Sequence, residues 1–240
     1  MYPSLIRSQA RLTLTNQWKI AIWITFLAGF FGATLIGIPG VNINLTVSKE
    51  SIHKIPENIL KLIHILINIA GVLAIIQFIL GSVIQLGYCR YLLNLVDGKE
   101  AKTRDLFSQF HLFKEAFLMN LLRGVYVFLW SLLFVIPGII ATLKYILAPF
   151  ILLENPGLRP KHAITESKYL MQGYKMNMFL LWLSFIGWSF LCVLTLGIGY
   201  FWLAPYMNVS IAHFYRNLRP RKHIQTEAYP GIQEYPQIEY

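Results

Sequence analysis

The residues of this sequence whose types could do chemistry lie inside long apolar segments. The segment Ile59–Leu86 carries His64, Asn68, Gln77 and Gln85. An imidazole exchanges protons near neutral pH, and amides both donate and accept hydrogen bonds. At about 100° per residue, His64, Asn68 and Gln85 share one stripe of a helix, whereas Gln77 lies off that stripe. This pattern is typical of hydrogen bonding between helices, and a ligand or proton path that uses His64 and Asn68 is the alternative.

A lysine and a proline interrupt another apolar segment, Ile139–Leu153. Burying the Lys144 ammonium in lipid is costly. We therefore expect its side chain to reach the interface, to pair with backbone carbonyls or to lose its proton; contact with an anionic substrate is the functional alternative.

Pro149 lies in the sequence "YILAPF" and has a counterpart, Pro205, in "FWLAPY". Each proline lacks an amide hydrogen, so we predict helix kinks that frame a cavity or fit a curved bundle.

No enzyme motif is complete in this sequence. "GWSFL" lacks the closing glycine of a nucleophile elbow, and "GIGYFW" lacks the third glycine of a dinucleotide-binding loop. The acidic residues fall in loops, linkers, helix ends or the tail, so no carboxylate pair lies within an apolar segment. Histidine and cysteine do not show the spacing of metal ligands. We therefore expect no catalysis, no metal and no cofactor.

The composition is typical of a membrane protein. Of the 240 residues, 56% are hydrophobic and 13% charged, and the mean hydropathy is +0.53. The formal net charge of +10 is spread beside the apolar segments rather than gathered on one face with stacking aromatics, which argues against nucleic acid as a partner. Anionic lipid headgroups are the better counter-charge.

The apolar segments predict an all-α, polytopic transmembrane helical bundle of about six spans. The turns Pro137-Gly138 and Gly197 to Gly199 predict two helical hairpins, and the shared Leu-Ala-Pro motif suggests that these are diverged copies. Residues 41–48 alternate in polarity, which favours an extended interfacial loop or a pairing strand edge. The six expected spans are Lys19–Ile38, Ile59–Leu86, Phe117–Ile136, Ile139–Leu153, Met178–Leu196 and Ile198–Tyr215.

Charge asymmetry predicts the orientation. The N-terminus, the linkers after the second and fourth spans and the tail hold most lysines and arginines, whereas the other side holds three, Lys49, Lys54 and Lys61. Cytoplasmic loops carry such an excess, so both termini should be cytoplasmic. Leu106, Phe107, Phe110 and Phe113 predict one amphipathic cytoplasmic linker helix, and Ile164, Leu170 and Met171 predict another. These helices could lie in the headgroup plane or pack against the bundle.

The expected domain organisation is simple. Residues 1–222 form one six-span membrane domain, and residues 223–240, which contain prolines and no apolar period, form a disordered cytoplasmic tail.

Four stretches resemble the domain of unknown function 975 family, a family of uncharacterised bacterial integral membrane proteins. They are "LIRSQARLTLTNQW", "IPGIIATLKYILA", "AITESKYLMQGYKMNMF" with "LSFIGWSF", and "LGIGYFWLAPYMNVSIAHFY". The resemblance implies a polytopic protein of a Gram-positive plasma membrane and brings no activity or site residues with it. A more distant likeness is to the membrane domain that precedes some glycerophosphodiester phosphodiesterases, without their catalytic half.

These observations favour a plasma-membrane protein with a non-catalytic accessory or scaffold role. Its expected partners are membrane lipids, through anionic headgroups at the cytoplasmic face, and a membrane protein complex. The alternative is a small transporter or export helper. Its path would use His64, Asn68, Gln77, Gln85 and Lys144 and the kinks at Pro149 and Pro205.

Overall fold

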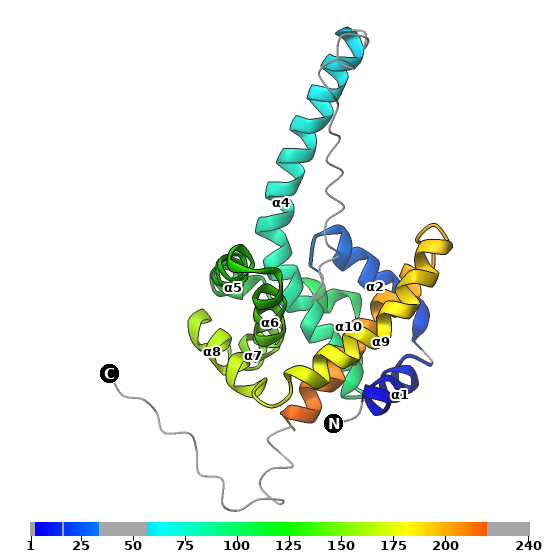
Figure 1. Ribbon diagram of the computed structural model, residues 1–240, viewed down its shortest axis with the longest axis vertical. Coiled ribbons are helices and arrows are strands. Elements are labelled where there is room, and N and C mark those ends of the chain that lie inside the picture. Colours follow the sequence, from blue (N-terminus) through cyan, green and yellow to red (C-terminus); the bar gives the residue numbers. More distant parts are fainter. Residues whose placement is uncertain (1–2, 16, 34–56, 220–240) are drawn as a thin grey trace, which may run out of the picture.

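The computed structural model describes residues 3–15, 17–33 and 57–219, and within these residues every regular element is a helix (Figure 1). The all-α prediction is confirmed for this part of the chain. The helices are α1 (Pro3–Leu14), α2 (Trp18–Phe30), α4 (Glu57–Val96), α5 (Phe113–Leu133), α6 (Val135–Tyr145), α7 (Ala148–Glu154), α8 (Pro160–Leu170), α9 (Lys175–Leu194) and α10 (Tyr200–Leu218). The predicted strand-like loop at 41–48 and the predicted tail at 223–240 lie outside the described residues.

Burial separates central from peripheral helices. Within an 18-residue apolar window of the segments Ile79–Val96 and Ile136–Glu154, 72% and 67% of the residues are buried, whereas the shares in Thr103–Leu133 and Lys175–Leu194 are only 11% and 22%. Most of α10 after Trp202 is buried as well. The core therefore consists of the second half of α4 with α7 and α10, and α5 and α9 present apolar side chains outward. An exterior of this kind is stable in lipid and not in water.

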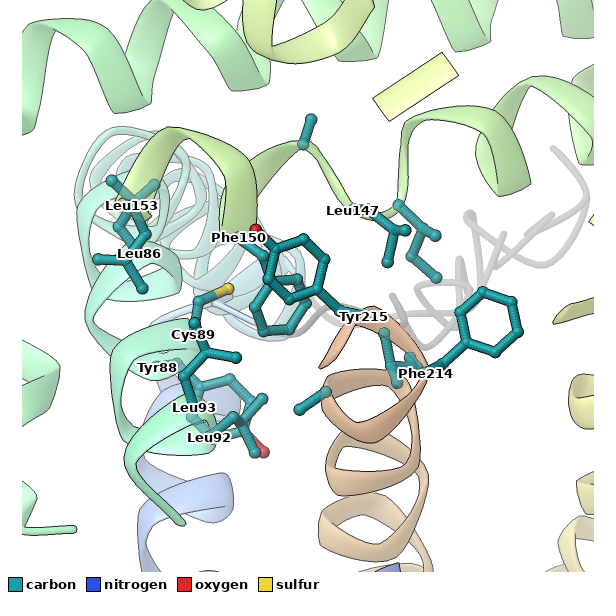
Figure 2. Close-up of a cluster of buried hydrophobic side chains, with 14 of the residues drawn as sticks. Leu86, Tyr88, Cys89, Leu92, Leu93, Leu147, Phe150, Leu153, Phe214 and Tyr215 are labelled. Atoms are coloured by element: carbon teal, nitrogen blue, oxygen red, sulfur yellow. The ribbon is translucent and has the colours of Figure 1, made fainter. Parts of the chain in front are cut away.

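Aromatic and aliphatic side chains fill the junction of these three central helices. Figure 2 shows Tyr88 and Cys89 of α4, Phe150 of α7 and Tyr215 of α10 in one cluster. The rings of Phe150 and Tyr215 stack with centroids 5.1 Å apart. The backbones of α4 and the segment at Leu106 approach closely here because Gly87 has no side chain. A Cβ at Gly87 would overlap the carbonyl group of Leu106. The 3₁₀ turn η1 (Thr103–Phe107) therefore lies directly against α4.

The structure supports a helical membrane bundle but not the count of six spans. Among the described residues, four segments are long and apolar enough to cross a bilayer: Ile79–Val96, Thr103–Leu133, Ile136–Glu154 and Lys175–Leu194. Helix α2 has 13 residues, or about 20 Å at 1.5 Å per residue, which is shorter than a hydrocarbon core of about 30 Å. The 40 residues of α4 extend ten residues beyond the predicted end at Leu86 and give a helix about 60 Å long.

The hairpin between α5 and α6 turns earlier than predicted. Phe134 is the extended residue between the two helices, and Pro137 and Gly138 lie in the first turn of α6. Proline is tolerated there because the first amides of a helix need no intrahelical acceptor. Gly138 instead allows close packing, since a Cβ at this position would collide with Ser131 on α5.

The two linkers differ from each other. The first forms two 3₁₀ turns, η1 and η2 (Phe110–Leu112), rather than one amphipathic α-helix. The second forms α8, as its pattern predicted, and Ile164 and Met171 are buried. Of the two alternatives for this helix, packing against the bundle is therefore the one the structure shows.

Candidate functional site

The structure distributes the predicted polar residues of α4 over two environments. Asn68 is exposed, and the side chain of His64 lies outside the described part. Gln77 is exposed and donates a hydrogen bond to the carbonyl oxygen of Phe30 at 2.7 Å, which ties α4 to the end of α2. Gln85 is 3% exposed. These residues therefore do not share one surface, and Gln77 makes a contact between helices.

Lys144 lies near the end of α6, on a different part of the bundle. Its ammonium nitrogen is 5.5 Å from the centre of the Trp130 ring on α5, a cation–π geometry. Its backbone carbonyl accepts a hydrogen bond from Ser167 of α8 at 2.8 Å. Lys144 thus joins α6 to α5 and α8, and its side chain is only partly buried.

The two prolines have different local structures. α6 ends at Tyr145 and α7 begins at Ala148, so Pro149 occupies the second position of a new helix. The predicted kink is thus a complete break over Ile146 and Leu147. Pro205 lies inside α10, which is helical from Tyr200 to Leu218. Both prolines are buried.

A group of charged residues that sequence reasoning did not single out joins the ends of the three central helices. Arg216 of α10 donates from Nε and Nη2 to the two oxygens of Asp97, at 2.9 and 2.8 Å. Its Nη1 donates to Oε1 of Glu154 at 2.6 Å. Asp97 follows the last residue of α4, and Glu154 is the last residue of α7. We call Asp97, Glu154 and Arg216 the helix-end clamp.

Neighbouring side chains extend the helix-end clamp. Tyr215 donates its hydroxyl hydrogen to the other oxygen of Glu154 at 2.5 Å. Arg219 reaches Glu166 of α8 at 2.7 Å. Burial alone would lower the pKa of the Arg216 guanidinium, but its hydrogen bonds to Asp97 and Glu154 raise that pKa above the ordinary value. Arg216 therefore stays charged.

The helix-end clamp places the ends of α4, α7 and α10 together at one end of the bundle. The N-terminal helix α1 lies beside the same part of α10, because Thr13 and His213 are 2.8 Å apart and Asn217 donates to Gln9 at 3.3 Å. The sequence offered one signal for this site. An acidic residue follows or ends two of the apolar segments and an arginine follows a third, but only packing shows that they meet.

A cavity of about 190 Å³ lies beside the helix-end clamp. Two of its lining cations, Arg90 and Lys99, are exposed and make no ion pair among the described residues. Of the predicted path residues whose side chains the structure describes, none lines this cavity. Its walls are Arg90, Leu93, Asn94, Asp97, Lys99, Leu153, Glu154 and Arg216.

A second polar contact lies deeper in the core. The hydroxyls of Thr25 on α2 and Tyr88 on α4 are 2.9 Å apart, and both residues are almost fully buried. The ring of Tyr88 stacks on that of Tyr91 with centroids 6.3 Å apart. A hydrogen bond between helices contributes about 0.6 to 2 kcal/mol in lipid, so this contact serves helix packing.

Comparison with known proteins gives a family without an assigned activity. No curated protein and no solved structure matches the chain. The matching family is described as protein of unknown function (DUF975), and its match covers residues 132–222, from the end of α5 through α10. This matched region includes Glu154 and Arg216 of the helix-end clamp, whereas Asp97 lies outside it. The similarity to the DUF975 family of proteins of unknown function is therefore limited to residues 132–222 of the chain.

Proposed function

We propose that this protein is a multi-pass plasma-membrane protein with a non-catalytic accessory or scaffold role. It contacts lipid through its apolar exterior and a partner membrane protein through the projecting part of α4. The positive charge beside the predicted spans supports cytoplasmic termini. The meeting of α1 with the ends of α4, α7 and α10 is consistent with that orientation.

The projecting part of α4 carries the partner proposal. The first half of this helix extends beyond the other helices (Figure 1). Leu62, Ile65, Leu66 and Ile69 are each more than half exposed and recur at the spacing of one helix face. A helix uses a face of this kind to pack against another apolar surface.

Length favours a protein as part of that surface. The apolar segment Ile59–Leu86 is about 42 Å long at 1.5 Å per residue, and the hydrocarbon core is about 30 Å thick. Lipid therefore covers the whole segment only if the helix tilts strongly. A neighbouring membrane protein would cover the remaining apolar face without that tilt.

Photo-crosslinking in native membranes tests this proposal. A photoreactive residue at Leu66 should give an adduct with one protein of defined mass. The matched site is Leu183 of α9, which is 48% exposed on a face expected to meet lipid, and it should give lipid adducts. If Leu66 also gives lipid adducts alone, the protein has no partner on α4 and the scaffold role is refuted.

A further inference from the structure

The residues that line the cavity beside the helix-end clamp carry more positive charge than negative charge. Both oxygens of Asp97 accept hydrogen bonds from Arg216, and the two oxygens of Glu154 accept from Arg216 and Tyr215. All four carboxylate oxygens therefore already have donors. Arg90 and Lys99 remain as the exposed cations of the cavity wall without an ion pair in the described part of the chain.

Arg90 is an exposed charge within an apolar segment. It falls inside the apolar segment Ile79–Val96, six residues before its end, or about 9 Å along the helix axis. An exposed guanidinium in such a segment is costly in lipid unless it reaches an anion near the interface. The guanidinium also presents paired N–H donors whose geometry matches two oxygens of a phosphate.

The remaining walls suit the ester end of a lipid. Leu93 and Leu153 give the cavity an apolar side, from α4 and α7 respectively. At about 30 Å³ per water molecule, a volume of about 190 Å³ would hold about six waters, which is enough room for a phosphate group and its ester carbons. Basic pockets between membrane helices at the cytoplasmic side are typical headgroup sites.

We propose that this cavity binds the phosphate headgroup of an anionic phospholipid, with Arg90 and Lys99 as its cationic ligands. The proposal builds on the lipid contact in the proposed function and names its chemistry and its site. In the bound state, Arg90 donates to the phosphate from the membrane side, Lys99 donates from the aqueous side, and the ester carbons lie against Leu93 and Leu153. The helix-end clamp holds the cavity walls in place and does not touch the phosphate.

Lipid binding to the purified full-length chain tests this site. Native mass spectrometry in a non-ionic detergent would measure the dissociation constant of phosphatidylglycerol for the wild type and for the double variant Arg90→Gln/Lys99→Gln. The expected loss is at least about tenfold, the equivalent of one charge-assisted hydrogen bond. The matched control, Arg104→Gln/Lys161→Gln, removes two exposed cations outside the cavity and should keep wild-type affinity.

Three results would overturn the proposal. The first is wild-type affinity in the double variant, and the second is an equal loss in the control, which would indicate unspecific attraction. The third is competition by glycerol 3-phosphate at the affinity of the lipid, which would make a soluble phosphate the ligand. The melting temperature of each variant verifies that it folds. The single variant Arg90→Lys keeps the charge and loses the paired donors, so it should give an intermediate affinity if Arg90 binds the phosphate.

This lipid-binding assay contains no partner protein. Lipid binding can therefore be refuted while crosslinking at Leu66 still finds a partner, and a failed crosslinking test leaves the lipid-binding result unaffected.

Discussion

The two halves of α4 belong to one helix and have opposite surroundings. From Gly81 to Cys89 every residue is buried among α2, α7, α10 and η1, and Asp97 just beyond the helix joins the helix-end clamp. In the first half, Leu62 and Leu66 are each 55% exposed. Both halves are apolar, so hydrophobicity alone does not decide which part of a membrane helix is buried in protein. Close backbone contacts with neighbouring elements distinguish the buried half, such as that of Gly87 with Leu106.

The largest expected difference between the halves concerns leucine truncation. Leu86 is fully buried, so Leu86→Ala leaves a cavity and should lower the free energy of unfolding by about 2 to 5 kcal/mol. Leu66→Ala makes the same chemical change on the exposed face and should alter it by less than about 0.5 kcal/mol. Reversible unfolding in lipid nanodiscs measures both. Equal losses would mean that the first half of α4 is also packed within the monomer.

The next effect concerns the helix-end clamp. Arg216→Met removes the partner of two carboxylates and should destabilise the bundle by up to about 3 kcal/mol, toward the lower limit for a buried pair because Glu154 remains 26% exposed. Thermal unfolding in detergent measures this loss. Lys161→Met, an exposed cation on α8, is the control and should leave the melting temperature unchanged. An unchanged melting temperature in Arg216→Met would show that packing alone holds the three helix ends together.

The smallest of the three effects concerns close approach. Gly87→Ala places a methyl group against the carbonyl oxygen of Leu106, a backbone atom that cannot rotate away, and should cost about 1 to 3 kcal/mol. Gly187→Ala on α9 meets open space and should be neutral or stabilising by up to about 1 kcal/mol. The same unfolding measurement compares them. A stabilised Gly87→Ala variant would contradict the contact between α4 and η1.

The two Leu-Ala-Pro motifs show where local sequence ceases to predict structure. Pro149 follows a break and starts α7, whereas Pro205 lies within the continuous α10. The residues around each proline are nearly alike, and a missing amide hydrogen permits either a break or a distorted helix. Packing makes the choice, since the short α7 is buried and contacts α4 and α8, whereas α10 packs against α1, α2, α4 and α9.

The prediction of functional residues from the sequence was limited in a similar way. Periodicity placed Asn68 and Gln85 on one stripe, but that stripe passes from the exposed half of α4 into the buried half. Lys144 could be recognised as an unusual charge from the sequence, yet its contact with Trp130 depends on how α5 and α6 pack. The helix-end clamp was missed because its members are separated by more than fifty residues along the chain.

The sequence by itself determined that this protein is helical, that it is suited to a membrane and that its cations gather beside the apolar segments. These properties follow from composition and local period, because a backbone in lipid must satisfy its own hydrogen bonds. Only the tertiary structure decided which apolar faces are buried, where the helices break, and that Asp97, Glu154 and Arg216 meet. Those outcomes depend on contacts between distant segments, and local sequence does not encode the distance between them.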